Sequence, residues 1–315
     1  MSKRISHGPK RIESDKRISE LLIETGAYKD LDKPVILTSG ELGIYYINTE
    51  KLCQDNGKFN DYGDDSWAMI NHAISMTKKH PTFKEVIDIL SEDVRGLLSQ
   101  ANPACNYAVS GGQRRDWLFS GPVAKNLDVD HISLYKDGKM EVINPKGKII
   151  SPDLELENYH VVHVVDLLTE GSSAYRKEEG KEKGWIPMIR KGGGAIRDLV
   201  AVVTRLQGGE ERLEEQEVNV TAKIAINDNF LKQRSNNPKR ALSYAADPKK
   251  WSENYLKENG ALNLLNTFDP NGGKMDRAKK FLIRYGGFLK EYGKFKELED
   301  AVQNTYKISL VDIVK

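Results

Sequence analysis

The chain has 315 residues, of which 39% are hydrophobic; this is enough for more than one compact unit and excludes a largely disordered chain. The 48 basic and 46 acidic residues leave a net charge of +2, which argues against a protein that mainly binds nucleic acid. The 2 cysteines exclude a disulfide framework and favour a reducing compartment, and no apolar run reaches the roughly 18 residues of a membrane span. We therefore expect a cytoplasmic protein that contacts no membrane.

The N-terminal third is typical of a helix, two strands and a long helical region. Residues 1–16 are polar and are expected to be flexible. Apolar periodicity predicts a helix over 18–26 that ends at a glycine. Runs rich in β-branched and aromatic residues predict strands at 35–38 and 44–48, and two apolar faces predict helix over 64–101.

From residue 106 the pattern alternates between strands and helices. We predict a helix over 118–127 and interpret 195–199 as the end of another helix. The segment 159–166 is almost continuously apolar and β-branched, which is typical of a strand buried on both faces of a parallel sheet. The order of strand, helix and strand predicts an α/β fold with right-handed crossovers. The predicted strands lie at 107–109, 131–135, 159–166 and 199–203.

After residue 232 the strand signals stop. Helices are predicted over 249–258, 274–285 and 286–301, with a turn at 269–273. The charge-dense segment 176–183 is expected to be a solvated helix face or a surface loop. The C-terminal helices also leave open an interaction protein, whose basic residues contact a partner or nucleic acid. These residues are Lys249, Lys250, Lys274, Lys279 and Lys280.

The stretch 164–173 carries the most chemical information. A buried strand ends near Asp166, and the chain then turns through 169–173 into an expected helix. Successive N–H groups in such a turn, with a helix N-terminus behind them, form a cradle for an anion. Gly171 lets the backbone approach a phosphate closely. An ordinary strand, turn and helix with serine caps explains the same spacing.

This stretch resembles the phosphoribosyl-pyrophosphate (PRPP) motif of type I phosphoribosyltransferases. The chain as a whole resembles the orotate phosphoribosyltransferase family, because four further segments agree in the expected order. They are 22–26 at the end of the first helix, 38–48 as the hood segment, 134–139 as the start of a mobile catalytic loop, and 204–210 near the base. The resemblance implies a parallel sheet flanked by helices with a small hood over 17–232, followed by a C-terminal helical extension over 233–315.

The resemblance also implies a role for each matching residue. Asp166 would contact the ribose hydroxyls and Mg²⁺, and Lys136 and Lys139 would close over the pyrophosphate. The loop for the 5′-phosphate would be Thr169, Glu170, Gly171, Ser172 and Ser173. The residues assigned to pyrophosphate are Gly111, Gly112, Arg114 and Arg115. Those assigned to orotate are Arg205, Tyr45 and Tyr46.

The implied activity joins orotate to PRPP and gives orotidine 5′-monophosphate and pyrophosphate, with Mg²⁺, in a homodimer with shared active sites. Four positions depart from the pattern, and each departure removes or reverses a charge near a polyanionic ligand. Val165 replaces an acidic residue, while Thr38, Glu41 and Tyr135 replace basic ones. These departures leave open a non-catalytic protein that senses PRPP or a nucleotide, and a phosphoribosyltransferase for another base.

Overall fold

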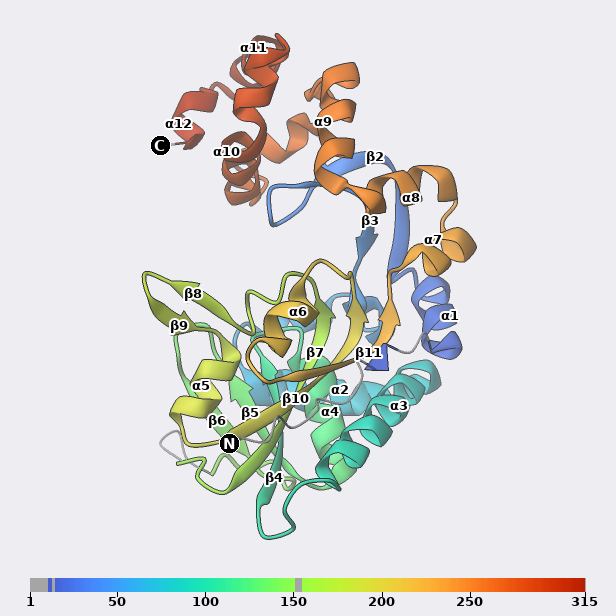
Figure 1. Ribbon diagram of the computed structural model, residues 1–315, viewed down its shortest axis with the longest axis vertical. Coiled ribbons are helices and arrows are strands. Elements are labelled where there is room, and N and C mark those ends of the chain that lie inside the picture. Colours follow the sequence, from blue (N-terminus) through green and yellow to red (C-terminus); the bar gives the residue numbers. More distant parts are fainter. Residues whose placement is uncertain (1–10, 13–14, 151–154, 315) are drawn as a thin grey trace, which may run out of the picture. The chain divides into compact units, whose positions relative to one another are not determined.

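The computed structural model describes residues 11–12, 15–150 and 155–314, so most of the segment 1–16 lies outside the described residues. The chain divides into two compact units (Figure 1). The first unit comprises Met1–Ala27 and Asn48–Ile226, and the second comprises Tyr28–Ile47 and Asn227–Lys315. The division predicted at residues 232 and 233 stays a prediction.

A seven-stranded sheet forms the centre of the first unit, in the order β1-β11-β10-β7-β4-β5-β6. Neighbouring strands are parallel except β5 and β6, which are antiparallel. The predicted α/β fold class with a mainly parallel sheet is therefore confirmed. The strands are β1 (Arg11–Ile12), β4 (Asn106–Gly112), β5 (Asp130–Leu134), β6 (Met140–Ile143), β7 (Tyr159–Leu168), β10 (Ala195–Thr204) and β11 (Asn219–Ala225).

Helices flank this sheet on both sides (Figure 1). Pro81 is the first residue of its helix and divides the predicted helical region 64–101 into two helices, since proline is tolerated there but not in a helix interior. The helices of this unit are α1 (Lys16–Glu24), α2 (Ser66–Lys79), α3 (Pro81–Leu98), α4 (Trp117–Leu127), α5 (Trp185–Lys191) and α6 (Gly209–Glu214), with the 3₁₀ helices η1 (Thr49–Cys53) and η2 (Lys58–Tyr62).

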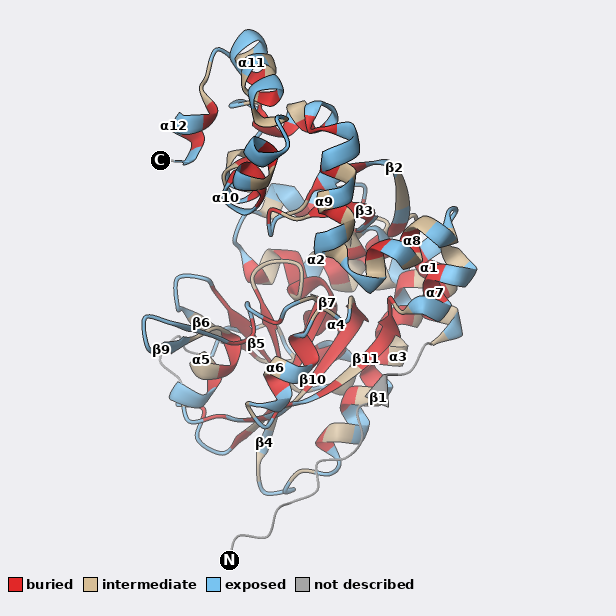
Figure 2. Cartoon of the chain, turned by 45° about the horizontal axis from the view of Figure 1, so that its top comes forward, coloured by how far each residue is buried: buried red, intermediate tan, exposed pale blue. Residues whose placement is uncertain are grey.

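Strand β7 lies in the core of this unit, as its apolar sequence predicts. Val161 and Val165 share an apolar cluster with Ile186 and Ile189 of α5, and α3 and α4 also contact β7. Figure 2 shows the central strands as the most continuously buried part of the sheet. In the parts of the chain that the structure describes, no helix combines the length and the apolar composition needed to cross a membrane.

Two buried histidines are held by serine hydroxyls within this sheet. His163 of β7 pairs through Nδ1 with the Ser110 hydroxyl at 2.8 Å, and His131 of β5 pairs through Nε2 with Ser120 of α4 at 2.8 Å. Burial lowers the pKa of each histidine to about 3. Both imidazoles are therefore neutral at physiological pH.

Two sequence interpretations in this unit are wrong. Residues 195–199 are not the end of a helix but the start of β10, which pairs with β7 from Ala195 opposite His160 onward. Ile196 is buried between two exposed neighbours, and this alternation is a strand pattern that the short window obscured. The segment between the predicted strands 131–135 and 159–166 also contains β6, for which no strand was predicted and which pairs with β5.

The charge-dense segment 176–183 forms an exposed hairpin rather than a helix face or an irregular loop. Its strands are β8 (Arg176–Glu178) and β9 (Lys181–Lys183). The two residues between them, Glu179 and Gly180, both have positive φ angles, of 52° and 75°. A two-residue turn of this kind matches the twist of paired strands, which explains why a hairpin forms here.

The second unit combines the hood strands with the C-terminal helices. Its hairpin consists of β2 (Tyr28–Ile36) and β3 (Leu42–Ile47), which are antiparallel. Ile36 and Leu42 share one apolar cluster with Phe268, Phe281 and Leu289. The sequence did not indicate this shared core. The helices are α7 (Asp228–Arg234), α8 (Pro238–Ala246), α9 (Pro248–Asn259), α10 (Met275–Glu291), α11 (Phe295–Tyr306) and α12 (Leu310–Val314), with the 3₁₀ helix η3 (Leu262–Phe268).

Helix α10 continues through Gly286, where the sequence predicted a boundary between two helices. The buried side chains of Tyr285 and Leu289 lie on either side of this position and anchor the helix in the core. Tertiary packing thus overrides the low helix propensity of glycine here.

Helix α10 contacts the turn of the hood hairpin. Gly40 has a φ of 84°, and a Cβ atom there would lie 2.7 Å from backbone and side-chain carbon atoms of Lys280. Lys280 Nζ donates to the Thr38 carbonyl at 3.1 Å, and Arg284 pairs with the Glu41 carboxylate at 2.6 Å. Basic residues of α10 thus contact Thr38 and Glu41, the two hood positions where the sequence resemblance implied basic residues and this chain has none.

Tyr244 of α8 gives a test of this shared core. Its buried hydroxyl donates to the Leu42 carbonyl at 2.7 Å. Changing Tyr244→Phe should lower the free energy of unfolding by about 1–2 kcal/mol, because it leaves a buried carbonyl without this donor. The control Tyr292→Phe removes a hydroxyl from a more exposed ring and should change stability by less than about 0.5 kcal/mol. Urea denaturation measures the free energy of unfolding of both variants, and equal losses would contradict a stabilising role of the Tyr244–Leu42 hydrogen bond.

Candidate functional site

Asp166 lies near the carboxyl end of β7 and is almost completely buried. Its Oδ2 accepts a hydrogen bond from the Thr49 hydroxyl at 2.5 Å and lies 3.5 Å from Nε of Arg115. The structure therefore brings two residues of the predicted site, Asp166 and Arg115, together in the first unit. The carboxyl ends of strands are where ligands bind in open α/β sheets.

Asp116 places a second carboxyl group at this point. Its Oδ1 accepts from the backbone N–H of Asp166 at 3.0 Å, and its Oδ2 accepts from the N–H of Gly112 at 3.1 Å. Burial and the neighbouring Asp166 carboxylate hold the pKa of Asp116 well above its usual range. Two carboxyl groups and a guanidinium thus meet where β4 and β7 end, and we call this group of Asp116, Asp166 and Arg115 the carboxylate centre.

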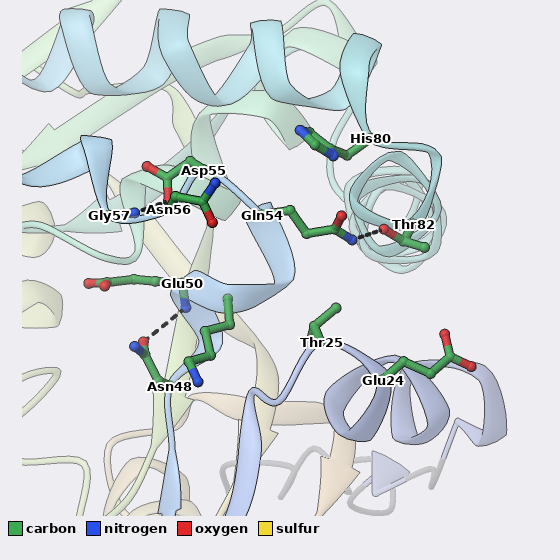
Figure 3. Close-up of a pocket in the computed structure, with 11 residues that line it drawn as sticks. Glu24, Thr25, Asn48, Glu50, Gln54, Asp55, Asn56, Gly57, His80 and Thr82 are labelled. Atoms are coloured by element: carbon green, nitrogen blue, oxygen red, sulfur yellow. Dashed lines mark hydrogen bonds between the residues drawn. The ribbon is translucent and has the colours of Figure 1, made fainter.

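Glu50 follows Thr49 in η1 and interacts electrostatically with Arg115 and Asp166 of the carboxylate centre. Burial raises the pKa of the Glu50 carboxyl, and the guanidinium of Arg115 opposes this shift. Glu50 also lines a cavity of ≈ 740 Å³ (Figure 3). The short helix η1 therefore contacts the carboxylate centre through Thr49 and lines the cavity through Glu50.

The cavity beside η1 is polar. Figure 3 shows the Gln54 amide reaching the Thr82 hydroxyl near the start of α3, and Asn48 accepting a hydrogen bond from the backbone N–H of Glu50. These bonds fix part of the lining without a ligand. The lining residues are Glu24, Thr25, Asn48, Glu50, Lys51, Gln54, Asp55, Asn56, Gly57, His80 and Thr82.

The proposed phosphate loop, residues 169–173, follows β7 directly, but the helix expected behind it is interrupted. One turn forms, in which the N–H groups of Ala174 and Tyr175 donate to the Gly171 carbonyl. The hairpin β8–β9 then intervenes before α5 begins. The N–H of Trp185 donates to the Ser173 carbonyl at 3.1 Å, so α5 stacks on the isolated turn. The hairpin is therefore an insertion that separates the first helical turn from the rest.

Gly171 has a structural reason for its identity. Its φ is 70°, and a Cβ atom there would lie 3.2 Å from Gly209 at the start of α6. In the described part of the chain, no hydrogen bond is recorded for the backbone N–H groups of 169–173. The loop thus offers a row of donors beside Asp166, which suits an anion.

The two arginines predicted for pyrophosphate differ in their surroundings. Arg115 faces Asp166, whereas Arg114 donates to the Gly63 carbonyl and to Asn60 Oδ1, at 3.1 and 2.9 Å. Gly111 and Gly112 are packed too closely for a side chain, against Ser120 and Trp185 respectively. The Gly112 N–H, a predicted anion donor, is occupied by the Asp116 carboxyl.

The two predicted loop lysines lie in the turn of the hairpin β5–β6. The backbone N–H of Lys136 donates to Gln113 Oε1 at 2.9 Å. Lys139 Nζ pairs with Glu141 Oε1 at 2.7 Å, and Tyr135 donates to the same carboxylate through its hydroxyl. Lys139 is therefore paired with Glu141 in this structure.

The three residues predicted to bind orotate are divided between the units. Arg205 follows β10 in the first unit, and its N–H donates to the Leu168 carbonyl at 2.9 Å. Tyr45 and Tyr46 lie in β3 of the second unit. Tyr45 is buried and stacks on Tyr28, whereas Tyr46 is 43% exposed. Since neighbouring strand residues point to opposite faces, one side chain serves the core and the other is accessible.

The donor set fits a Mg²⁺ ion that arrives with phosphate. Such an ion is usually held by one or two carboxylates together with substrate oxygens. Asp166 supplies one carboxylate at the edge of the sheet, close to the proposed phosphate loop. Within residues 11–12, 15–150 and 155–314, no cluster of three or more His, Cys, Asp or Glu side chains is arranged to hold a metal. The metal prediction therefore rests on Asp166 and the substrate.

Three residues of this site were missed by sequence reasoning: Thr49, Glu50 and Asp116. Each is remote in sequence from Asp166; Thr49, for example, is 117 residues away. Asp116 carried a weak signal, since it follows two arginines in the segment predicted to bind pyrophosphate. Only the fold reveals that all three surround the end of β7.

The known proteins to which this chain is similar are phosphoribosyltransferases. Adenine phosphoribosyltransferase of Shewanella pealeana is 27% identical over 182 residues, which cover 50% of this chain and 92% of the relative. Orotate phosphoribosyltransferase of Methanopyrus kandleri is 23% identical over 217 residues, or 67% of this chain and 90% of the relative. The solved orotate phosphoribosyltransferase from Aeropyrum pernix is 18% identical with a TM-score of 0.45, covering 69% of this chain and 98% of its own. No family model matches.

Both sequence relatives are phosphoribosyltransferases, one named for adenine and the other for orotate. They support the prediction of a transferase enzyme but do not decide between the two bases. Over half or more of its length, this chain is therefore similar to phosphoribosyltransferases.

Proposed function

We propose that this protein transfers the 5-phosphoribosyl group of PRPP to orotate and releases pyrophosphate. The observation that supports this most is the carboxylate centre, in which Asp166 is held by Thr49 and lies beside Arg115. The loop 169–173 follows within three residues and offers open N–H donors. A carboxylate for ribose hydroxyls and a cradle for phosphate are thus adjacent in one unit.

The chemistry of this transfer is mainly electrostatic. As pyrophosphate departs, the ribose gains oxocarbenium character and the leaving group gains negative charge. The Asp166 carboxylate would accept hydrogen bonds from the ribose hydroxyls. The Arg115 guanidinium would bind pyrophosphate, because its planar fork matches phosphate oxygens. When bound, Mg²⁺ would supply further neutralisation of the leaving group.

A second candidate is transfer to adenine, which the Shewanella relative favours. Orotate carries a carboxylate, and Arg205 at the end of β10 is the residue predicted to bind it. Adenine is neutral and needs no such cation. The charge of the base, which Arg205 would recognise, therefore distinguishes the two candidates.

A two-base assay tests this choice. We expect PRPP and Mg²⁺ to support consumption of orotate, followed by ultraviolet absorbance, with a smaller rate or none for adenine. Faster conversion of adenine would replace the first candidate by the second. Binding of PRPP without conversion of either base would favour the sensing alternative, and equilibrium sedimentation in the same buffer would test the predicted homodimer.

Lys139→Ala is expected to lower kcat by about 10- to 100-fold while changing the Kd of PRPP less, because its cation would stabilise charge that develops only as pyrophosphate leaves. To act, Lys139 must exchange its Glu141 partner for the substrate. The control Lys78→Ala removes an exposed lysine near the end of α2. Steady-state kinetics and titration calorimetry compare the variants, and equal turnover in both would remove Lys139 from the mechanism.

A further inference from the structure

Asp116 occupies the N-cap position of α4 but does not cap this helix. At five other helix starts the cap residue is Asp or Asn, and its side chain accepts from the backbone N–H three residues further on. That bond is the usual reason for such a residue at a helix start. The carboxyl group of Asp116 turns away from it, so its position needs another explanation. The capping residues are Asp15, Asp65, Asn227, Asn237 and Asp247.

The Asp116 carboxyl instead joins two strands beyond the end of their ladder. The pairing of β4 with β7 ends at Ser110 opposite His163. Further along, Asp116 Oδ1 accepts from the N–H of Asp166 at 3.0 Å, and Oδ2 accepts from the N–H of Gly112 at 3.1 Å. One side chain thus replaces the missing backbone bonds and fixes the spacing of the two strand ends.

This bridge bears directly on two residues of the proposed site. Gly112 is the last residue of β4, and Arg115 follows in the connection to α4. Arg115 Nε lies 3.5 Å from Asp166 Oδ2, which also accepts from the Thr49 hydroxyl. Asp166 is therefore held through its main chain by Asp116 and through its side chain by Thr49.

We propose that Asp116 is a positioning residue that holds Arg115 and Asp166 at the spacing which the pyrophosphate and ribose of PRPP require. This inference rests on the proposed function. Asp116 acts through its two neighbours and does not itself touch the substrate. Because a shift of about 1 Å in such a site lowers rates steeply, loss of the bridge affects binding and turnover even when the fold is kept.

Asp116→Asn is the most direct variant, since asparagine has the same size but offers one carbonyl oxygen for two N–H donors. In the full-length protein, titration calorimetry should show about 10-fold weaker PRPP binding, and kcat should fall by about 10- to 100-fold. The matched control Asp65→Asn changes an aspartate that caps α2 and should leave both quantities within about twofold.

A double-mutant cycle separates positioning from general stability. If Asp116 acts partly by placing Arg115, then Asp116→Asn should weaken PRPP binding by a clearly smaller factor in an Arg115→Ala background than in the wild-type protein, and the remaining effect reflects the hold on Asp166. Fully additive effects, or wild-type binding by Asp116→Asn, would overturn the inference. A wild-type protein that binds no PRPP would instead reject the proposed function, and the inference with it.

A measurement on the wild-type protein avoids any dependence on how the variants fold. The amide protons of Gly112 and Asp166 are bound by Asp116, so they should exchange slowly with solvent and remain protected when PRPP binds. Rapid exchange of either proton, with or without PRPP, would contradict the bridge that the inference requires.

Discussion

Asp166→Asn is expected to lower kcat/KM for PRPP by about 100- to 1000-fold. The change keeps the size of the side chain but removes the charge that faces Arg115 and the proposed ribose site. Asparagine can still accept from the Thr49 hydroxyl through its amide oxygen, so the local structure should survive. The loss should therefore appear in PRPP binding and turnover, measured by calorimetry and steady-state kinetics.

The control for this experiment is Asp198→Asn in the neighbouring strand β10. Asp198 pairs with Val162, toward the opposite end of β7, and contacts Asn219 rather than any residue of the carboxylate centre. Its replacement should change kcat/KM by less than about threefold. Wild-type kinetics in Asp166→Asn, or an equal loss in both variants, would contradict the role of Asp166.

The two buried histidines are expected to lower the free energy of unfolding by about 4 kcal/mol when the pH falls from 7 to 5. Burial lowers the pKa of His131 and of His163 to about 3, while an unfolded histidine titrates near 6.5. Between these values the unfolded chain binds protons that the folded chain does not. The stabilising effect is complete well above pH 6.5, and below pH 6.5 its loss approaches about 1.4 kcal/mol per pH unit for each histidine.

Urea denaturation at pH 7 and pH 5 measures this loss. Burial also lowers the pKa of His72 and His160, which adds to this loss. The raised pKa values of Asp116 and Glu50 oppose it, because those folded carboxyl groups bind protons that the unfolded chain does not. The variant His163→Gln should show a shallower pH dependence of stability than the wild-type protein, because it removes one of the two buried neutral imidazoles. The same pH dependence in the wild-type protein and in His163→Gln would refute the burial of a neutral histidine at this position.

Local sequence patterns predicted the part of the fold that local physics determines. The apolar, β-branched run of β7 could only be buried on both faces, so its place inside a parallel sheet and the position of Asp166 near its end followed directly. The helices α1 and α4 also follow from periodicity. Those parts needed no knowledge of distant residues.

The rest depends on contacts between residues far apart in the chain. Asp116 was not singled out from the sequence, because its bond to Asp166 spans 50 residues. The hood turn packs on α10 through Gly40 and Lys280, although 240 positions separate these residues. No local pattern encodes such pairs. The hairpin β8–β9 was not predicted for a different reason: charged residues surround its Glu179–Gly180 turn, and the segment lacks the alternating apolar residues that indicate strands.

Pyrophosphate release from PRPP tests most directly whether this protein is a phosphoribosyltransferase. Purified full-length protein with PRPP and Mg²⁺ should release pyrophosphate when orotate or adenine is added and should release little without a base. The Asp166→Asn variant should be nearly inactive in the same assay. No release with either base, together with no change in thermal stability on adding PRPP, would contradict the proposal that the carboxylate centre and the loop 169–173 bind this substrate.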